Sequence, residues 1–141
     1  MSKNFLIGEV AAQFGLTVPT IRYYDQEGLI PNLAKNESGQ RVFNEENLDA
    51  LQIVECLKDS GMAIKDIKQF MQWVDEGDAS LVNRRDMFLR LQQQMKEKME
   101  RMEQTMRVLD YKVGYYGKAV NDGTEKYVKH AGKPIAEIIK G

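Results

Sequence analysis

The strongest constraint on the fold of this 141-residue chain is a run of apolar side chains that repeats every seven residues. The spacing alternates between four and three residues, as in the seam of a coiled coil. The seam positions are Met95, Met99, Met102, Met106, Leu109 and Val113. Little of the chain remains to bury such a stripe, so residues 77–113 are predicted to form a long dimerisation helix that pairs with a second copy.

An alternative reading of the same stripe is a single long helix that packs against its own domain. Towards the N-terminus the seam is looser, because the register meets Gln92, Phe88, Arg85 and Leu81. Methionine fills four seam positions, which predicts an adaptable interface.

Composition excludes several functional classes. The net charge is −1, so the chain is not a strongly basic protein that coats nucleic acid without regard to sequence. One cysteine and one histidine (His130) exclude an intramolecular disulfide and disfavour a metal site, and no cofactor is expected. The single cysteine makes a reducing cytoplasm the expected compartment, and no apolar run is long enough to span a membrane. No paired carboxylates, Ser-His-Asp set or phosphate-binding glycine loop indicates an enzyme.

Two short helices are predicted at the N-terminus. Residues 7–15 place apolar side chains at helical spacing and end at a glycine, and residues 20–28 form the next helix after a short turn. Thr17 is a candidate cap, and Pro19 suits a first helical turn. This is the outline of a helix-turn-helix, although a hairpin of two helices in a larger bundle has the same pattern.

A small β-hairpin is predicted at residues 33–43, with Ser38 and Gly39 at its tip. Helices follow at 43–61, capped by Asn44, and at 62–77. Residues 1–76 are therefore expected to form a mainly α-helical, winged helix-turn-helix domain with a helical linker, and residues 114–141 a short, weakly patterned tail.

The segment TIRYYDQEGLIP, then SGQRVF, then a helix ending CLKDSGM and the heptad helix, closely resembles the MerR family of transcriptional regulators. The resemblance covers roughly residues 5–113. It implies an antiparallel coiled-coil homodimer that binds a near-palindromic operator in double-stranded promoter DNA. It also implies that the dimer distorts this DNA, so that RNA polymerase, contacted indirectly, can use the promoter in response to a stress signal.

The resemblance also assigns DNA-binding residues. The expected contacts are Thr20, Arg22, Tyr23, Gln40, Arg41 and Lys58. Tyr23 is expected to face a phosphate and Tyr24 to pack inward. Many relatives have an aromatic residue where this chain has Gln40. The alternative for Arg22 is a surface interaction with Asp25 or Gln26 on its own helix.

Cys56 is the expected sensor. Its segment resembles the cysteine-bearing branch of the family that responds to aldehydes and other electrophiles, the NmlR- and AdhR-like regulators, in which the thiol is the proposed sensor. An activating cation would come from the partner chain or from the next helix, for example Lys65. The alternatives are a small molecule bound where the head meets the coiled coil, near Phe70 and Trp73, with a structural Cys56, and a coiled-coil adaptor that does not bind DNA.

Overall fold

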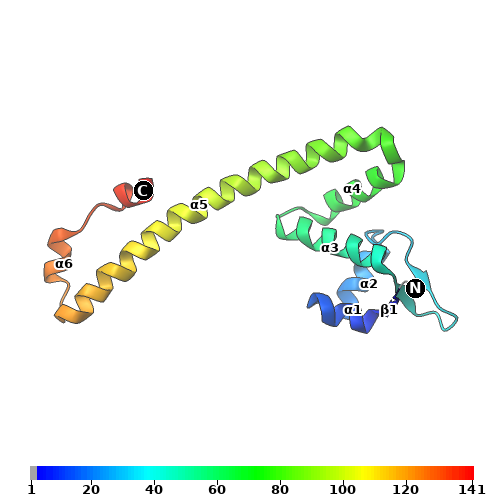
Figure 1. The fold of residues 1–141 in the computed structure, drawn as a ribbon, viewed down its shortest axis with the longest axis horizontal. Coiled ribbons are helices and arrows are strands. Elements are labelled where there is room, and N and C mark those ends of the chain that lie inside the picture. The colour runs from blue at the N-terminus through cyan, green and yellow to red at the C-terminus, as the bar shows by residue number, and fades with distance from the viewer. Residues whose placement is uncertain (1–2) are drawn as a thin grey trace. The chain divides into compact units, whose positions relative to one another are not determined.

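The computed structural model describes residues 3–141. It is mainly helical, with one small sheet, and it divides into two compact units that meet within the long helix after Phe88 (Figure 1). The expected fold class, a winged helix-turn-helix followed by a long helix, is confirmed.

The helix-turn-helix consists of α1 (Ile7–Phe14) and α2 (Val18–Gln26). Gly15 ends α1 in the left-handed conformation, with φ of 64°, which suits a residue without a side chain. The hydroxyl of Thr17 accepts a hydrogen bond from the Thr20 amide and so caps α2, whose first turn contains Pro19 as predicted. The helix begins two residues earlier than predicted, because Thr17 caps it directly before Val18.

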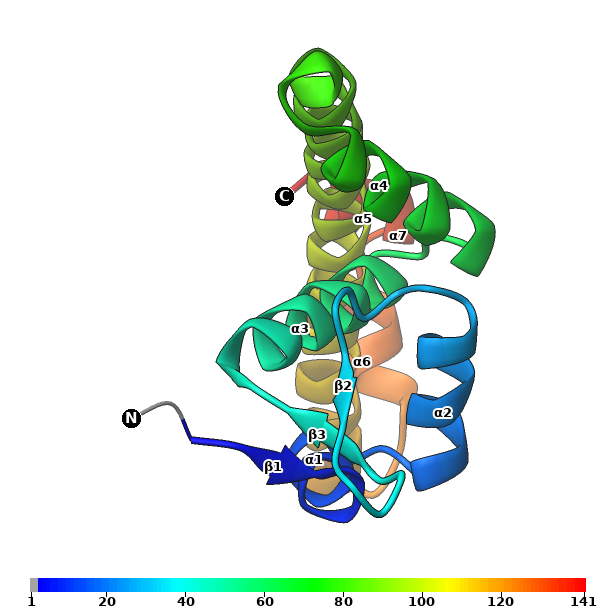
Figure 2. The ribbon, with the colours of Figure 1, turned by 90° about the vertical axis from the view of Figure 1, so that its right-hand side faces the viewer.

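The wing belongs to a three-stranded antiparallel sheet with the order β1-β3-β2 (Figure 2). The hairpin of β2 (Ala34–Lys35) and β3 (Arg41–Phe43) was predicted, and its turn is held by the Asn36 carboxamide, which accepts from the Ser38 and Gln40 amides. The third strand, β1 (Phe5–Leu6), was not predicted. It ties the start of the chain to β3, because Phe5 pairs with the buried Phe43.

Two further helices, α3 (Glu45–Asp59) and α4 (Ile64–Glu76), complete the head. Asn44 caps α3 as predicted, and the side-chain oxygen of the buried Asn47 accepts a hydrogen bond from the Asn44 amide. The Asn47 side chain also donates to the Pro31 carbonyl at 2.9 Å, which fixes α3 against the loop after α2. The apolar side chains of both helices form the core with α1 and α2.

The last part of the first unit joins α4 to the long helix through a single turn, η1 (Gly77–Ser80). The Ser80 hydroxyl donates to the Trp73 and Gly77 carbonyls. The ring of Phe88, on the first turns of the long helix, packs edge-on against Phe70 at 5.4 Å between centroids.

The long helix, α5 (Leu81–Asp122), has 42 residues and continues past the end of the predicted stripe at Val113. The chain then turns back along α5 as α6 (Lys126–Ala131) and α7 (Ile135–Lys140), which the weak pattern of the tail did not predict (Figure 1). We call residues 123–141 the C-terminal strap. His130, expected in an unstructured tail, is exposed on α6.

Candidate nucleic-acid interface

The two tyrosines of α2 point in different directions. Tyr23 is 45% exposed, whereas Tyr24 is 2% exposed. Neighbouring helical residues are separated by about 100° around the axis, so one of a pair can face solvent while the other enters the core. The expected inward packing of Tyr24 is confirmed, and Tyr23 remains available on the outer face of α2.

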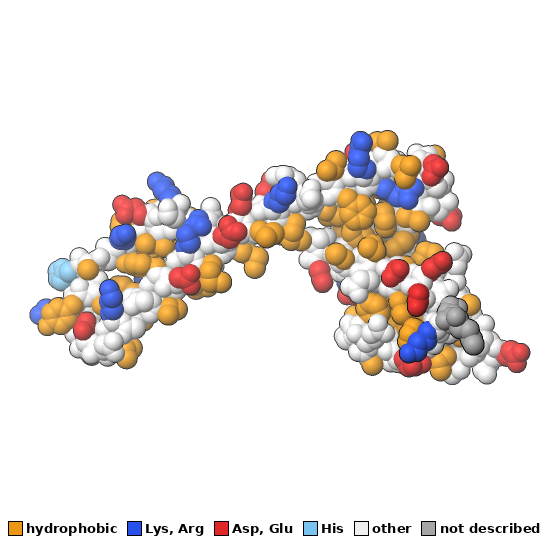
Figure 3. Space-filling view, viewed as in Figure 1, with side chains coloured by type: hydrophobic (Ala, Val, Ile, Leu, Met, Phe, Trp, Pro, Cys, Tyr) orange, Lys and Arg blue, Asp and Glu red, His pale blue; other side chains and the backbone are white. Residues whose placement is uncertain are grey.

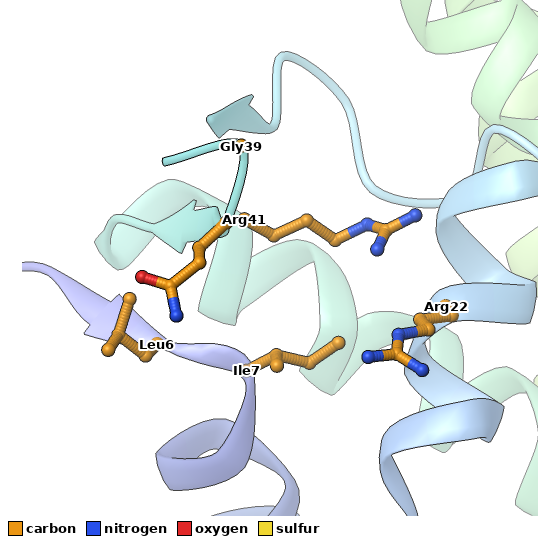
Figure 4. Close-up of a pocket in the computed structure, with 6 residues that line it drawn as sticks. Leu6, Ile7, Arg22, Gly39 and Arg41 are labelled. Atoms are coloured by element: carbon orange, nitrogen blue, oxygen red, sulfur yellow. The ribbon is translucent and has the colours of Figure 1, made fainter. Parts of the chain in front are cut away.

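A hollow lies between α2, the wing and the start of α1 (Figure 4). Its volume is about 210 Å³. Its lining residues are Leu6, Ile7, Arg22, Gly39, Gln40 and Arg41. The guanidinium groups of Arg22 and Arg41 come from separate elements and reach the same region, while Leu6 and Ile7 form its apolar side. Two arginines at a hollow on an exposed surface suit a phosphate group.

Arg41 of the wing forms an ion pair with Asp25 of α2. The Arg41 Nε lies 2.7 Å from Asp25 Oδ2, and both side chains are largely buried. This ion pair fixes the wing against α2. The alternative partners of Arg22, Asp25 and Gln26, are not used, since Arg22 forms no ion pair or hydrogen bond within the described residues 3–141.

Two other residues predicted to contact DNA, Thr20 and Gln40, form side-chain hydrogen bonds with neighbouring residues at the protein surface. The Thr20 hydroxyl lies 2.8 Å from the Thr17 hydroxyl, within the cap of α2. The Gln40 carboxamide accepts from the Asn36 side chain at 3.1 Å, across the turn of the wing. Gln40 lines the hollow, and both residues use part of their hydrogen-bonding capacity within the chain.

Lys58 lies at the end of α3 and forms a small network with α2. Its ammonium donates to the Tyr24 hydroxyl at 2.5 Å, and that hydroxyl donates to Glu55 at 3.1 Å. The bond to Tyr24 raises the pKa of Lys58, whereas burial is the main reason that the pKa of Tyr24 is raised. Lys58 therefore connects α3 to α2, which sequence reasoning did not predict.

Cys56 lies next to this network and its side chain is exposed. Ile53, one turn before Cys56, is also exposed, because Leu51, Val54 and Leu57 already fill the buried face of α3. Within the described part of the chain the thiol forms no hydrogen bond with Lys65 or another cation, and the Lys65 side chain is exposed. Near the junction with α5, Phe70 is buried and Trp73 partly buried.

The predicted seam forms an exposed apolar edge on α5 (Figure 3). Met99, Met102, Met106, Leu109 and Val113 are between 53% and 74% exposed. The same alternation of three and four residues continues to Tyr116 and Val120, which are 50% and 78% exposed. The exposed stripe is therefore seven residues longer than the sequence analysis assigned.

Other kinds of site find little support. Residues 3–141 contain no cluster of His, Cys, Asp or Glu side chains that could hold a metal ion. In the same range, each helix is too short or too polar to cross a bilayer.

The fold and this surface define a winged helix-turn-helix DNA-binding protein. The family model described as "MerR HTH family regulatory protein" matches residues 5–73. An uncharacterised HTH-type transcriptional regulator of Haemophilus influenzae is 33% identical over 125 residues, which cover 89% of this chain and 93% of that protein. The chain belongs to the MerR family of DNA-binding transcriptional regulators, whose members matched here are regulators rather than enzymes.

Two further relatives are informative. The crystal structure of HiNmlR, described as a MerR family regulator lacking the sensor domain and bound to promoter DNA, superposes with a TM-score of 0.82 at 32% identity, over 89% of this chain and 99% of that one. The transcriptional regulator AdhR of Bacillus subtilis is 35% identical over 80 residues, 57% of each chain.

Proposed function

We propose that this regulator binds a near-palindromic promoter operator as a homodimer. The observation that carries the proposal is the hollow lined by Arg22 of α2 and Arg41 of the wing, together with the exposed Tyr23 that follows Arg22 on α2. This surface combines a helix of major-groove size with a wing that reaches a flanking phosphate. The crystal structure of the relative HiNmlR with promoter DNA supports the same role for this chain.

The exposed stripe of α5 supports the dimer. One winged head makes few contacts with DNA, whereas two heads joined by a coiled coil bind two half-sites with a fixed separation. In this proposal the helices pair in antiparallel fashion through residues Met95 to Val113. The dimer then distorts the promoter between the half-sites, and RNA polymerase responds to the changed geometry. A coiled-coil adaptor would have no use for the two arginines at the hollow.

We also propose that the signal is an aldehyde or another electrophile that reacts with Cys56. The exposure of the thiol and its position beside the Glu55-Tyr24-Lys58 network support this role. A modified side chain there would disturb a network that ends on the recognition helix. The alternative is a ligand near Phe70 and Trp73, with Cys56 unmodified.

DNA binding is tested by fluorescence anisotropy, with the DNA upstream of this protein's own gene and a random duplex of equal length. Arg22→Ala is expected to weaken binding to the upstream DNA by about 1–3 kcal/mol if Arg22 reads a base edge. The control is Arg101→Ala, which removes the same charge from α5. Equal losses in both variants, or equal affinity of the wild type for both duplexes, would refute the proposed interface.

A further inference from the structure

The C-terminal strap is held to α5 by three side chains that lie one helical turn apart. The Arg107 Nε donates to the Ile139 carbonyl at 3.0 Å. The Tyr111 hydroxyl accepts from the Lys133 amide at 2.8 Å. The Tyr115 hydroxyl donates to Glu125 at 3.0 Å. The strap therefore runs antiparallel to α5, with its last residues at Arg107 and its first residues at Tyr115.

These contacts leave the dimer seam open. Successive residues of an α-helix are about 100° apart, so Tyr111 lies on the side of α5 opposite Leu109, Val113 and Tyr116. A second copy can pair along the seam while the strap stays in place. The strap consequently covers a surface of α5 that the proposed dimer does not use.

A hollow of about 270 Å³ lies beneath the strap, between α5 and α6. We call it the strap hollow. Its lining residues are Asp110, Tyr111, Gly114, Tyr115, Lys118, Val128, Ala131 and Gly132. Asp110, Gly114 and Lys118 follow one another at intervals of four residues, so they form a row along α5. The row presents a carboxylate, an open position and an ammonium, with the two tyrosines beside it.

Packing does not require a glycine at position 114, the open position in the row. Glycine is among the least favourable residues inside a helix, and Gly114 lies well within α5. A side-chain carbon added at Gly114 would meet no atom within 4 Å, whereas one added at Gly132 would meet the Tyr111 hydroxyl at 3.2 Å. Gly132 thus allows the strap to approach closely, but Gly114 only keeps the hollow empty.

The charged groups of the row have no partner of their own. Asp110 and Lys118 form no ion pair or hydrogen bond within the described residues 3–141. Eight residues separate them, or about 12 Å along the helix axis, so they are not direct neighbours. The Tyr111 hydroxyl accepts a bond from the strap, and its own proton remains available to donate. The hollow therefore offers a carboxylate, an ammonium and a hydroxyl donor around an apolar, aromatic centre.

We propose that the strap hollow binds a small zwitterion with an apolar body, a molecule with the chemistry of a free amino acid or a dipeptide. The amine binds at Asp110, the carboxylate binds at Lys118, and the apolar body lies over Gly114 against the rings of Tyr111 and Tyr115. Such a ligand joins the strap to the dimerisation helix. It gives the regulator a second input that is independent of Cys56 and of the DNA-binding surface.

The proposal is tested on the full-length chain by isothermal titration calorimetry without DNA. The probes are phenylalanine and diphenylalanine, with phenylalaninamide lacking the carboxylate and N-acetylphenylalanine lacking the amine. Gly114→Leu fills the hollow and is expected to abolish binding. The control, Gly117→Ala, also replaces a glycine of α5 by a better helix former, but residue 117 does not line the hollow.

The charge variants assign the two ends of the ligand. Asp110→Asn is expected to weaken binding of phenylalanine at least about tenfold, and to leave the weaker binding of N-acetylphenylalanine unchanged. Lys118→Met is expected to weaken binding of phenylalanine to a similar extent. It should leave unchanged the weaker binding of phenylalaninamide, which lacks the carboxylate. Absence of heat with all four probes, or equal affinity in Gly114→Leu and wild type, overturns the proposal. Because no DNA is present, this failure is distinguishable from a failure of the proposed promoter binding.

Discussion

The ammonium of Lys58 lies 2.5 Å from the hydroxyl oxygen of Tyr24, which joins the end of α3 to the buried face of α2. The ammonium also lies 5.1 Å from the centre of the Tyr24 ring. Through Tyr24, the charge of Lys58 is coupled to Glu55 on the preceding turn of its own helix. A residue expected to hold a DNA phosphate is therefore also a structural contact of the recognition helix.

Tyr24→Phe keeps the ring and removes this network. We expect the free energy of unfolding at pH 7 to fall by about 1 kcal/mol, as is typical for an intramolecular hydrogen bond. The measurement is urea denaturation monitored by circular dichroism. Tyr23→Phe is the control, because the exposed Tyr23 hydroxyl forms no hydrogen bond within residues 3–141, and equal losses in the two variants would contradict the role of the network.

The same network predicts a dependence on alkaline pH. The pKa values of Tyr24 and Lys58 are both raised above their ordinary values of 10.0 and 10.5. The folded chain thus holds these protons more tightly than the unfolded chain, and this stabilisation is present below pH 10 and lost as the pH rises through the folded-state values. Wild type should lose stability more steeply than Tyr24→Phe above pH 10 in the same denaturation experiment.

The ion pair of Asp25 with Arg41 predicts an effect on DNA affinity. If Asp25 orients Arg41 towards a phosphate, Asp25→Asn weakens binding by about threefold, although it removes a negative charge from the DNA-facing surface. The control is Glu27→Gln at the C-cap of the same helix, which removes the same charge but breaks only the contact with Lys68. Tighter binding by Asp25→Asn than by Glu27→Gln would mean that Asp25 competes with DNA for Arg41.

The sequence predicted those features that depend on periodicity and on local capping. Helical spacing predicted the two short N-terminal helices, and Thr17 and Asn44 cap the helices for which they were proposed. The inward Tyr24 and outward Tyr23 followed from the family resemblance. These features are local, since each depends on residues within about one helical turn.

Contacts between distant residues could not be predicted in the same way. Arg41 reaches Asp25 only because the sheet places the wing beside α2, and β1 has two residues, too few for an alternating pattern. The strap was missed because two of its three anchors on α5 bind backbone groups, which every residue possesses. Only the tyrosines of residues 111 and 115, spaced by one turn, could have indicated a covered surface there.

The length of the exposed stripe predicts how far the dimer interface extends. Val113→Asp and Val120→Asp each place a charge on the stripe, so each should shift the dimer towards monomer, with the larger effect at the more central Val113. Analytical ultracentrifugation over a range of concentrations measures the dissociation constant. Gln104→Asp places the same residue on the side of α5 opposite the stripe, at an exposed position, and should leave the constant nearly unchanged. If Val120→Asp has no effect either, the interface ends before Val120.

Cys56 is the only cysteine of the chain, so Cys56→Ser removes every thiol. We expect a reporter driven by the DNA upstream of this protein's own gene to respond to formaldehyde and methylglyoxal with wild type and to stay silent with Cys56→Ser. DNA affinity of the untreated variant, measured by anisotropy, should match wild type. Equal induction in both strains would retain the regulator but move the sensor away from Cys56, and would favour a ligand near Phe70 and Trp73.

The bond between Tyr111 and the Lys133 amide predicts that the strap is a cooperative part of the fold. Tyr111→Phe removes the acceptor and leaves that amide to exchange with solvent, so hydrogen exchange of residues 126–140 should become faster by about fivefold, the equivalent of about 1 kcal/mol. Tyr127→Phe is the control, since Tyr127 is 65% exposed and its hydroxyl has no hydrogen-bond partner within residues 3–141. If exchange is already unprotected in wild type, the strap does not remain on α5 in solution, and the hollow beneath it would exist only when a ligand holds the two together.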